Sequence, residues 1–141
     1  MLRHPETSKN LIDEKNIMTQ ASKAWGVTFK KLPLQYKLDF AITRNKNVIG
    51  FCEVKSRNCS VVQYNTYIIS LKKIMAGLEL AKITNTKSML LIGWNDMIGY
   101  TQMDTHFKTI IGGRTDRSDW QDEEPMAEIN ITKFKKLIKG E

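Results

Sequence analysis

The chain has 141 residues, of which 41% are hydrophobic and 26% charged, and these values suit one folded domain spanning residues 1–141. No apolar stretch approaches the roughly 18 residues that a membrane-spanning helix needs, and the N-terminus MLRHPETSKN lacks the apolar core of a secretory signal. We therefore expect no membrane association and a cytoplasmic protein whose two cysteines, Cys52 and Cys59, are reduced.

The charge is distributed unevenly along the chain. There are 22 basic and 15 acidic residues, which give a net charge of +7. Six of the acidic residues but only two of the basic ones lie between residues 114 and 128, so the rest has 20 basic and nine acidic residues and a net charge of +11. A basic body favours a polyanionic partner such as nucleic acid, because neutralised phosphates release condensed counterions. The alternative is that the charge serves solubility alone.

The first half of the chain predicts a helix followed by three strands. The helix is expected from Ser8 to Trp25, where apolar residues recur at helical spacing, and Gly26 ends it. The strands that follow are predicted at residues 27–32, 36–42 and 48–55.

The second half predicts another helix and further strands. Residues 67–83 have helical spacing, with an apolar stripe formed by Leu71, Ile74, Met75, Leu78 and Ala81. Two strands are expected at residues 88–94 and 98–103, followed by an irregular charged loop at residues 112–125. A short strand at residues 128–131 and a terminal helix at residues 133–139 complete the prediction. This order predicts an α/β fold with a mixed central sheet flanked by helices.

The chemically informative residues lie in the segment YKLDFAITRNKNVIGFCEVKSR, residues 36–57. Residues two apart on a strand share a face, so Glu53 and Lys55 are expected to point one way. Cys52 and Val54 are expected to point into the opposite layer. The segment therefore predicts a charged face and an apolar face on one strand.

An acidic residue, Asp39, interrupts the preceding strand. The apolar residues expected on the opposite face of that strand are Tyr36, Leu38, Phe40 and Ile42. Asp39 and Glu53, converging from neighbouring strands, could hold a hard divalent cation, since Mg²⁺ accepts one or two carboxylates and keeps several waters. Lys55 beside them could orient a water nucleophile or neutralise charge that grows on a phosphate. The alternative is a surface ion pair on an exposed sheet face.

This segment resembles the core of the PD-(D/E)xK nuclease superfamily, whose elements are a helix, a three-stranded meander, a helix and a strand. Glu53-Val54-Lys55 matches the ExK element, and Leu38-Asp39 matches the PD element with leucine in place of the usual proline. The gap of roughly fourteen residues between Asp39 and Glu53 is similar to that in archaeal Holliday-junction resolvases. The helix and strand after residue 67 resemble those of phage-type members.

The resemblance implies a restriction-endonuclease-like core, α-β-β-β-α-β, and a metal-dependent endodeoxyribonuclease that uses Mg²⁺ or Mn²⁺. It implies that Asp39, Glu53 and the backbone carbonyl of Val54 bind the metal. In the resolvase subgroup a glutamate on the first helix joins the metal shell, and Glu14 lies where such a residue would be. The alternative for Glu14 is an ordinary solvated helix residue beside Lys15.

The same resemblance extends the catalytic set to Lys55 and to a polar residue of the second helix, for which Lys73 is the candidate. The alternative for Lys73 is a solvated side chain or a plain phosphate contact. A chain this short has little surface for encircling a duplex, so we expect a homodimer, whose two sites would allow the paired cuts that resolvases need. Branched DNA is therefore the preferred substrate, in the host cytoplasm if the protein is viral. A nicking, restriction-like or end-processing nuclease of the same fold stays open, as does a catalytically silent DNA-binding module.

Two weaker features remain. The stretch from Gly112 to Arg117 could bind phosphate through backbone N–H groups, or it could be a connector with internal Arg–Asp pairs. Trp25 and Trp94 are expected to pack in the core or at its edge, whereas Trp120 could either pack or stack on a base.

Overall fold

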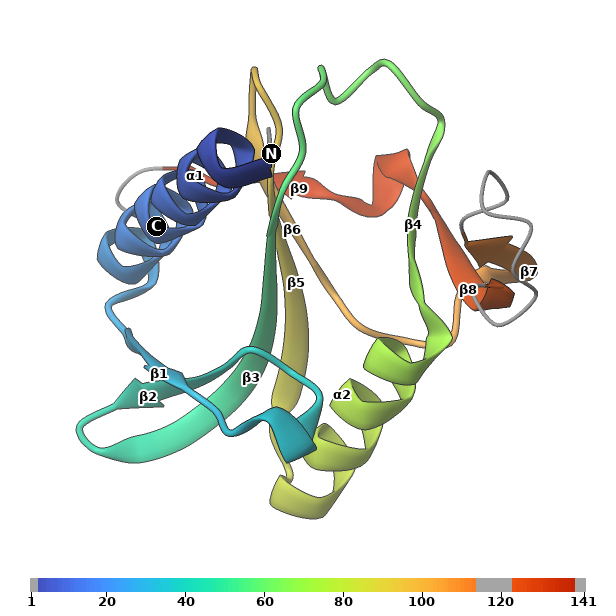
Figure 1. The fold of residues 1–141 in the computed structure, drawn as a ribbon. Coiled ribbons are helices and arrows are strands. Elements are labelled where there is room, and N and C mark those ends of the chain that lie inside the picture. Colours follow the sequence, from blue (N-terminus) through green and yellow to red (C-terminus); the bar gives the residue numbers. More distant parts are fainter. Residues whose placement is uncertain (1–2, 114–122, 139–141) are drawn as a thin grey trace.

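The computed structural model describes residues 3–113 and 123–138, and the side chains of residues 14–112 and 123–138. Within these residues a mixed six-stranded sheet occupies the centre, with helix α1 (Arg3–Trp25) against one face. Helix α2 (Leu71–Thr84) and a three-stranded antiparallel sheet lie on the opposite side (Figure 1). The predicted α/β class, with a mixed central sheet flanked by helices, is confirmed.

The central sheet has the strand order β1-β2-β3-β5-β6-β9. Its strands are β1 (Thr28–Lys31), β2 (Phe40–Arg44), β3 (Asn47–Ser56), β5 (Lys87–Gly93), β6 (Ile98–Gln102) and β9 (Lys135–Lys136). Strands β3 and β5 are parallel, and the other neighbours are antiparallel. A parallel pair needs a long crossover, and here the segment containing α2 supplies it.

The smaller sheet has the order β4-β8-β7. Its strands are β4 (Thr66–Ser70), β8 (Glu123–Asn130) and β7 (Lys108–Gly113). This sheet corrects the prediction that residues 67–70 are helical. It also corrects the two ends of the loop predicted at residues 112–125, because residues 112–113 and 123–125 belong to strands; residues 114–122 lie outside the described part of the chain. Tyr67 and Ile69 are buried while Ile68 is exposed, which is the two-residue period of a strand. The helix begins only after Ser70, whose side chain accepts a hydrogen bond from the N–H of Lys72.

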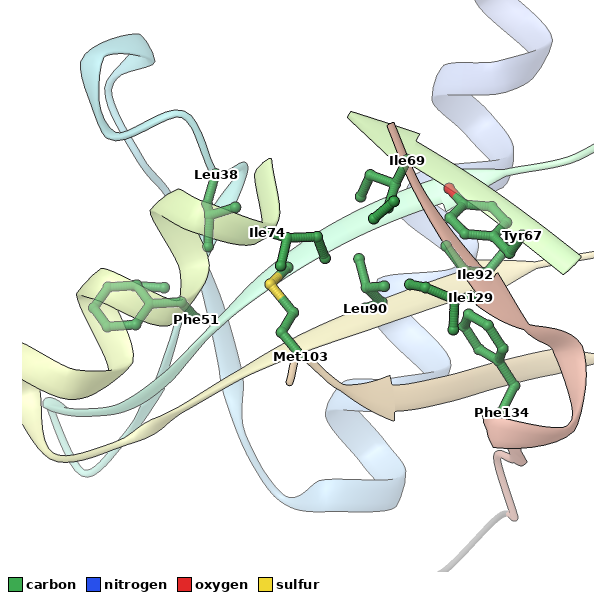
Figure 2. Packing of buried hydrophobic residues seen from close by; sticks show 12 residues of the cluster. Leu38, Phe51, Tyr67, Ile69, Ile74, Leu90, Ile92, Met103, Ile129 and Phe134 are labelled. Atoms are coloured by element: carbon green, nitrogen blue, oxygen red, sulfur yellow. The ribbon is translucent and has the colours of Figure 1, made fainter. Parts of the chain in front are cut away.

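Two hydrophobic clusters lie on opposite faces of the central sheet. The cluster against α1 includes Ile17, Ala21, Cys52, Val54 and Leu91. The cluster between the central sheet, α2 and the small sheet is larger, and Figure 2 shows its members converging from all three. Because β3 and β5 lie between the two clusters, their side chains are buried on both faces.

The start of β2 differs from its prediction. Pro33 is followed by a 3-10 turn, η1 (Leu34–Tyr36), and Lys37 then takes a left-handed conformation with φ of 64°. The strand therefore begins at Phe40, and Asp39 precedes it instead of lying within it. Leu38 belongs to the cluster beside α2, whereas Phe40 packs against the cluster beside α1, so the prediction of one shared face was wrong.

The prediction of a C-terminal helix at residues 133–139 was also wrong. Ile131–Lys133 forms the 3-10 turn η4, and Lys135–Lys136 then pairs with β6 as strand β9. In α2 the buried positions are Ile74 and Gly77, whereas Met75 of the predicted stripe is 61% exposed. The end of α1 agrees with the sequence, since Gly26 has a φ of +65° that favours glycine.

Trp25 and Trp94 pack against other aromatic rings, as predicted. Trp120, Arg114 and Arg117 lie outside the described residues. No helix in the described part of the chain is long and apolar enough to cross a membrane.

Candidate active site

Strand β3 carries the centre of the candidate site. Cys52 and Val54 point into the cluster beside α1, and Phe51 points into the cluster beside α2. Glu53 alternates with Cys52 and Val54, and its carboxylate meets Lys73 of α2. The prediction that Glu53 faces away from Cys52 and Val54 is confirmed. Glu53 is 0% exposed, and its neighbour on the adjacent strand is Leu90.

The carboxylate of Glu53 lies between two lysines. Oε2 is 3.6 Å from Nζ of Lys55, and Oε1 is 3.5 Å from Nζ of Lys73. Neither oxygen has a hydrogen-bond partner among the described residues. Burial raises the pKa of Glu53, the negative charge of Asp39 adds to the rise, and the two lysines oppose it.

Asp39 lies at the point where the chain enters β2. Its backbone carbonyl accepts a 2.9 Å hydrogen bond from the N–H of Leu32, which ties it to the end of β1. Its carboxylate forms a 3.7 Å ion pair with Lys31, and 20% of the side chain is exposed. Asp39 is therefore the more accessible of the two carboxylates, and it lies close enough to Glu53 to raise the pKa of that residue.

Glu14 approaches the same place from α1. Burial raises the pKa of Glu14, Lys55 opposes the rise, and Asp39 adds to it. Glu14 is therefore a half-buried residue within electrostatic reach of the site, unlike a freely solvated helix residue. The fold thus gathers all five side chains that the sequence proposed as catalytic, which are Glu14, Asp39, Glu53, Lys55 and Lys73.

Val54 can contribute only its backbone, because its side chain is buried on the opposite face. The pairing between β2 and β3 ends at Phe40 and Cys52, whereas β3 remains paired with β5 as far as Ser56. Beyond Cys52, β3 therefore has a ladder partner on one side only. The backbone between Glu53 and Lys55 lies where the sheet opens beside Asp39.

The chemistry of these donors fits a hard divalent cation. In the described residues, no group of three His, Cys, Asp or Glu side chains is positioned to hold a metal by itself. Mg²⁺ does not need such a group, because it binds one or two carboxylates and keeps several waters. The two buried oxygens of Glu53 have lysine neighbours at ion-pair distance but no well-formed hydrogen bond within the described residues, so a metal would satisfy atoms that the fold leaves poorly satisfied.

Sequence reasoning missed two cations beside the site. Lys31 pairs with Asp39, and the positive charge of Arg57 lowers the pKa of Glu14. For Arg57 a signal was present, because Glu53, Lys55 and Arg57 are spaced two apart. For Lys31 there was none, since its approach to Asp39 depends on the antiparallel pairing of Lys31 with Phe40.

Similarity to a known family covers almost the whole chain. No curated protein matches the chain. A family model described as "Phage putative PDDEXK endonuclease" matches residues 2–137, which include both helices and every candidate site residue. The α/β fold with its mixed central sheet is consistent with this family, and the family implies DNA as the substrate. The chain belongs to the phage PD-(D/E)xK endonuclease family.

Proposed function

We propose that the chain is a single-domain, metal-dependent endodeoxyribonuclease in which Asp39 and Glu53 bind Mg²⁺ or Mn²⁺. The backbone carbonyl of Val54 and the carboxylate of Glu14 complete the protein ligands. The observation that carries this proposal is the carboxylate of Glu53, which is fully buried and has two lysine ammonium groups only at 3.5–3.6 Å, too far for a well-formed hydrogen bond. Leaving such a group unsatisfied costs free energy, so a ligand that supplies positive charge is the simplest reason for it.

Each remaining residue has a role that follows from its position. A divalent ion, when bound, would supply a water of lowered pKa and stabilise negative charge on the phosphate. Lys55 lies at the more open end of the Glu53 carboxylate and is 37% exposed, so its ammonium can reach a water or a phosphate oxygen. Lys73 approaches from α2, holds the other oxygen of Glu53 and fixes the orientation of the carboxylate. Asp39 is accessible enough to face a substrate phosphate through the metal.

A catalytically silent DNA-binding module is the competing function. A silent module gains nothing from three acidic residues beside a phosphate-binding surface, because their charge repels the DNA backbone. Glu14, Asp39 and Glu53 all act on one another or on shared neighbours in the same small region. This concentration of negative charge within a chain of net charge +7 supports a nuclease over a silent module.

For the substrate we propose branched DNA, cut by a homodimer that places two sites for paired incisions. The gap between Asp39 and Glu53, which is similar to that of the resolvases, and the small size of one chain support this subclass. A nicking or end-processing activity of the same fold is the other outcome that the test must separate.

A cleavage panel tests the proposal. Linear duplex, flapped duplex and four-way junctions of equal sequence are incubated with the protein in Mg²⁺, in Mn²⁺ and in EDTA. We expect metal-dependent cuts, with the junction cut fastest and on two strands. Glu53→Gln is the control for a contaminating nuclease and should abolish the cuts. Binding without cleavage in every metal would establish the silent module instead, and single cuts in linear duplex would refute the branched substrate.

A further inference from the structure

Directly after β3 the chain forms a loop, residues 57–65, that encloses a small pocket beside the candidate site. The volume of this pocket is about 270 Å³, slightly below the roughly 300–1,000 Å³ common for small-molecule sites. We call it the β3–β4 pocket and define it by the lining residues Arg57, Cys59, Val61, Tyr64, Tyr67 and Trp94. Its size suits one ring system, and three of these six residues are aromatic.

The guanidinium of Arg57 forms one wall and is held in place. Its Nη2 donates a 3.0 Å hydrogen bond to the hydroxyl of Tyr67, its Nη1 donates a 3.4 Å hydrogen bond to the carbonyl of Ser56, and it lies 5.0 Å from the Tyr67 ring centroid. Burial raises the pKa of Tyr67 to about 12, so this hydroxyl stays protonated. A guanidinium has five N–H groups. Three of them therefore have no acceptor among the described residues and can bind an anion such as a phosphate.

The loop that shapes the pocket is fixed by hydrogen bonds to the turn between β5 and β6. Asp96 accepts hydrogen bonds from the hydroxyl of Ser60 at 2.7 Å and from the N–H of Val61 at 3.0 Å, and both lower the pKa of Asp96. The N–H of Asn95 donates to the carbonyl of Cys59 at 3.0 Å. The pocket is therefore preformed, which lowers the entropic cost of binding.

The β3–β4 pocket adjoins the candidate active site. Arg57 follows Glu53 by four residues, a distance of about 13 Å along an extended chain. Two lining residues of the pocket, Arg57 and Tyr67, lie within electrostatic reach of the carboxylates of the site. A DNA strand with one phosphate at Glu53 would thus bring a neighbouring nucleotide to Arg57.

We propose that the β3–β4 pocket binds an unpaired DNA base beside the phosphate that is cut, with Tyr64 stacking on the base and Arg57 contacting the adjoining phosphate. This inference rests on the proposed nuclease function and specifies its substrate class as DNA with an unpaired nucleotide next to the cut. Tyr64 is 61% exposed, and Trp94 presents part of its ring to the pocket. Aromatic side chains stack on any base, whereas a base paired within a duplex is not accessible to such a pocket.

The test measures binding in EDTA, where no metal-dependent cleavage occurs. The probes are a fluorescent single-stranded oligodeoxynucleotide and a strand of equal length made entirely of abasic sites, compared by anisotropy. The wild type should bind the base-bearing strand at least tenfold more tightly, equivalent to about 1.4 kcal/mol. Tyr64→Ala should lose this preference. Tyr36→Ala, which removes a half-exposed tyrosine that lines a different groove beside α2, should keep it.

A wild type that does not distinguish the two strands would overturn the proposal. So would a Tyr64→Ala protein that keeps the wild-type preference. Neither variant should unfold, because the side chain of Tyr64 is mostly exposed and that of Tyr36 is half-exposed. A circular dichroism melt of each verifies this point before binding is measured.

Cys59 provides a second readout inside the pocket. It is half-buried, whereas the only other cysteine, Cys52, is fully buried and inaccessible to a reagent in solution. Iodoacetamide should therefore label Cys59 selectively, and Cys59→Ser should abolish the labelling. The base-bearing strand should slow the labelling at least tenfold at saturation, and the abasic strand should not. Equal protection by the two strands would contradict base binding.

These readouts separate the pocket from the nuclease. Tyr64-dependent base binding by a protein that never cuts DNA in any divalent ion would refute the proposed nuclease function and support the pocket. Cleavage of a fully paired duplex that is unchanged by Tyr64→Ala would refute the pocket and leave the nuclease intact.

Discussion

The two faces of strand β3 differ sharply although they are equally buried. Toward α1, Cys52 and Val54 are 0% exposed and pack against apolar residues, with no charged partner to accommodate. Toward α2, Glu53 is also 0% exposed, and it has two lysines at ion-pair distance but no well-formed hydrogen bond within the described residues. The face toward α1 stabilises the fold through apolar packing, whereas the face toward α2 contains a buried charge that packing alone does not explain.

The difference between the two faces shows which side chains of β3 stabilise the fold. A buried charge costs several kcal/mol unless it is paired and hydrogen-bonded, and ion pairs at about 3.5 Å offset only part of that cost. An apolar residue at position 53 would satisfy the packing, as Phe51 and Leu90 do nearby. The packing of β3 therefore does not account for the acidic residue, whereas the proposed binding of a metal ion would.

The largest expected effect is on cleavage. Asp39→Ala and Glu53→Ala should each lower the cleavage rate by about 10³-fold or more, because losing the metal removes several kcal/mol of transition-state stabilisation. DNA binding should persist, since basic residues elsewhere supply most of the affinity. Single-turnover cleavage with a melting curve measures both. Either variant cutting at a near-normal rate with a normal melt would show that the site is assigned to the wrong residues.

Replacing Lys55 should have the next largest effect and should separate turnover from metal binding. Lys55→Ala should slow cleavage by about 10²-fold, a common effect of removing a positioned proton-transfer or charge-stabilising group. Affinity for Mn²⁺ should hold or rise, because a positive neighbour of the carboxylates is gone. Single-turnover kinetics measure the cleavage rate, and calorimetric titration measures the affinity for Mn²⁺. Lys72→Ala, on the exposed surface of α2, is the matched control. Loss of Mn²⁺ binding in Lys55→Ala would contradict the proposed division of roles.

A substitution on the apolar face of β3 should lower stability and leave metal binding and cleavage nearly unchanged. Val54→Ala should lower the free energy of unfolding by about 2 kcal/mol, because two buried methyl groups are removed and a small cavity remains. Its backbone carbonyl is unchanged, so metal affinity and the cleavage rate under stable conditions should stay close to those of the wild type. Urea denaturation gives the first quantity and calorimetry the second. A Val54→Ala protein that loses metal binding while keeping its stability would contradict the assignment of this face to stability alone.

The smallest expected effect is a gain of stability. Glu53→Gln should raise the free energy of unfolding of the metal-free protein by about 0.5–2 kcal/mol, as functional positions commonly permit. The pKa of Glu53 is raised in the folded state, so its charge destabilises the fold as the pH rises through that pKa. The two proteins should therefore be nearly equal below the usual glutamate value of 4.5, and the variant should gain its advantage above it.

Urea titrations from pH 4 to 8 in EDTA measure this difference between the two proteins. Mn²⁺ should stabilise the wild type and not the variant. A constant difference across the whole range would mean that Glu53 is not held at a disfavoured charge.

Local sequence chemistry determined most elements of the central sheet. The tight turn between β2 and β3 was readable from the polar residues 44–47 between two apolar strands. In the structure Asn45 and Lys46 of this turn have positive φ angles of 53° and 68°. Strands β3, β5 and β6 could be identified from the sequence because each is long or apolar. Strand β4 was not, because residues 66–70 continue directly into α2 and their register depends on pairing Tyr67 with Ile129, 62 residues away. Strand β9 likewise exists only through its pairing with Gly99.

The site follows the same division. The sequence alone placed Glu53 and Lys55 on one face and Asp39 nearby, because strand alternation and a short turn act over few residues. Only the tertiary structure decided that Glu53 is fully buried, that Lys73 reaches it from α2, and that Glu14 lies close enough to be affected by Asp39. Spacing within a helix says which residues share a face but not which strand that face meets. The packing of two helices on opposite faces of one sheet supplies that information.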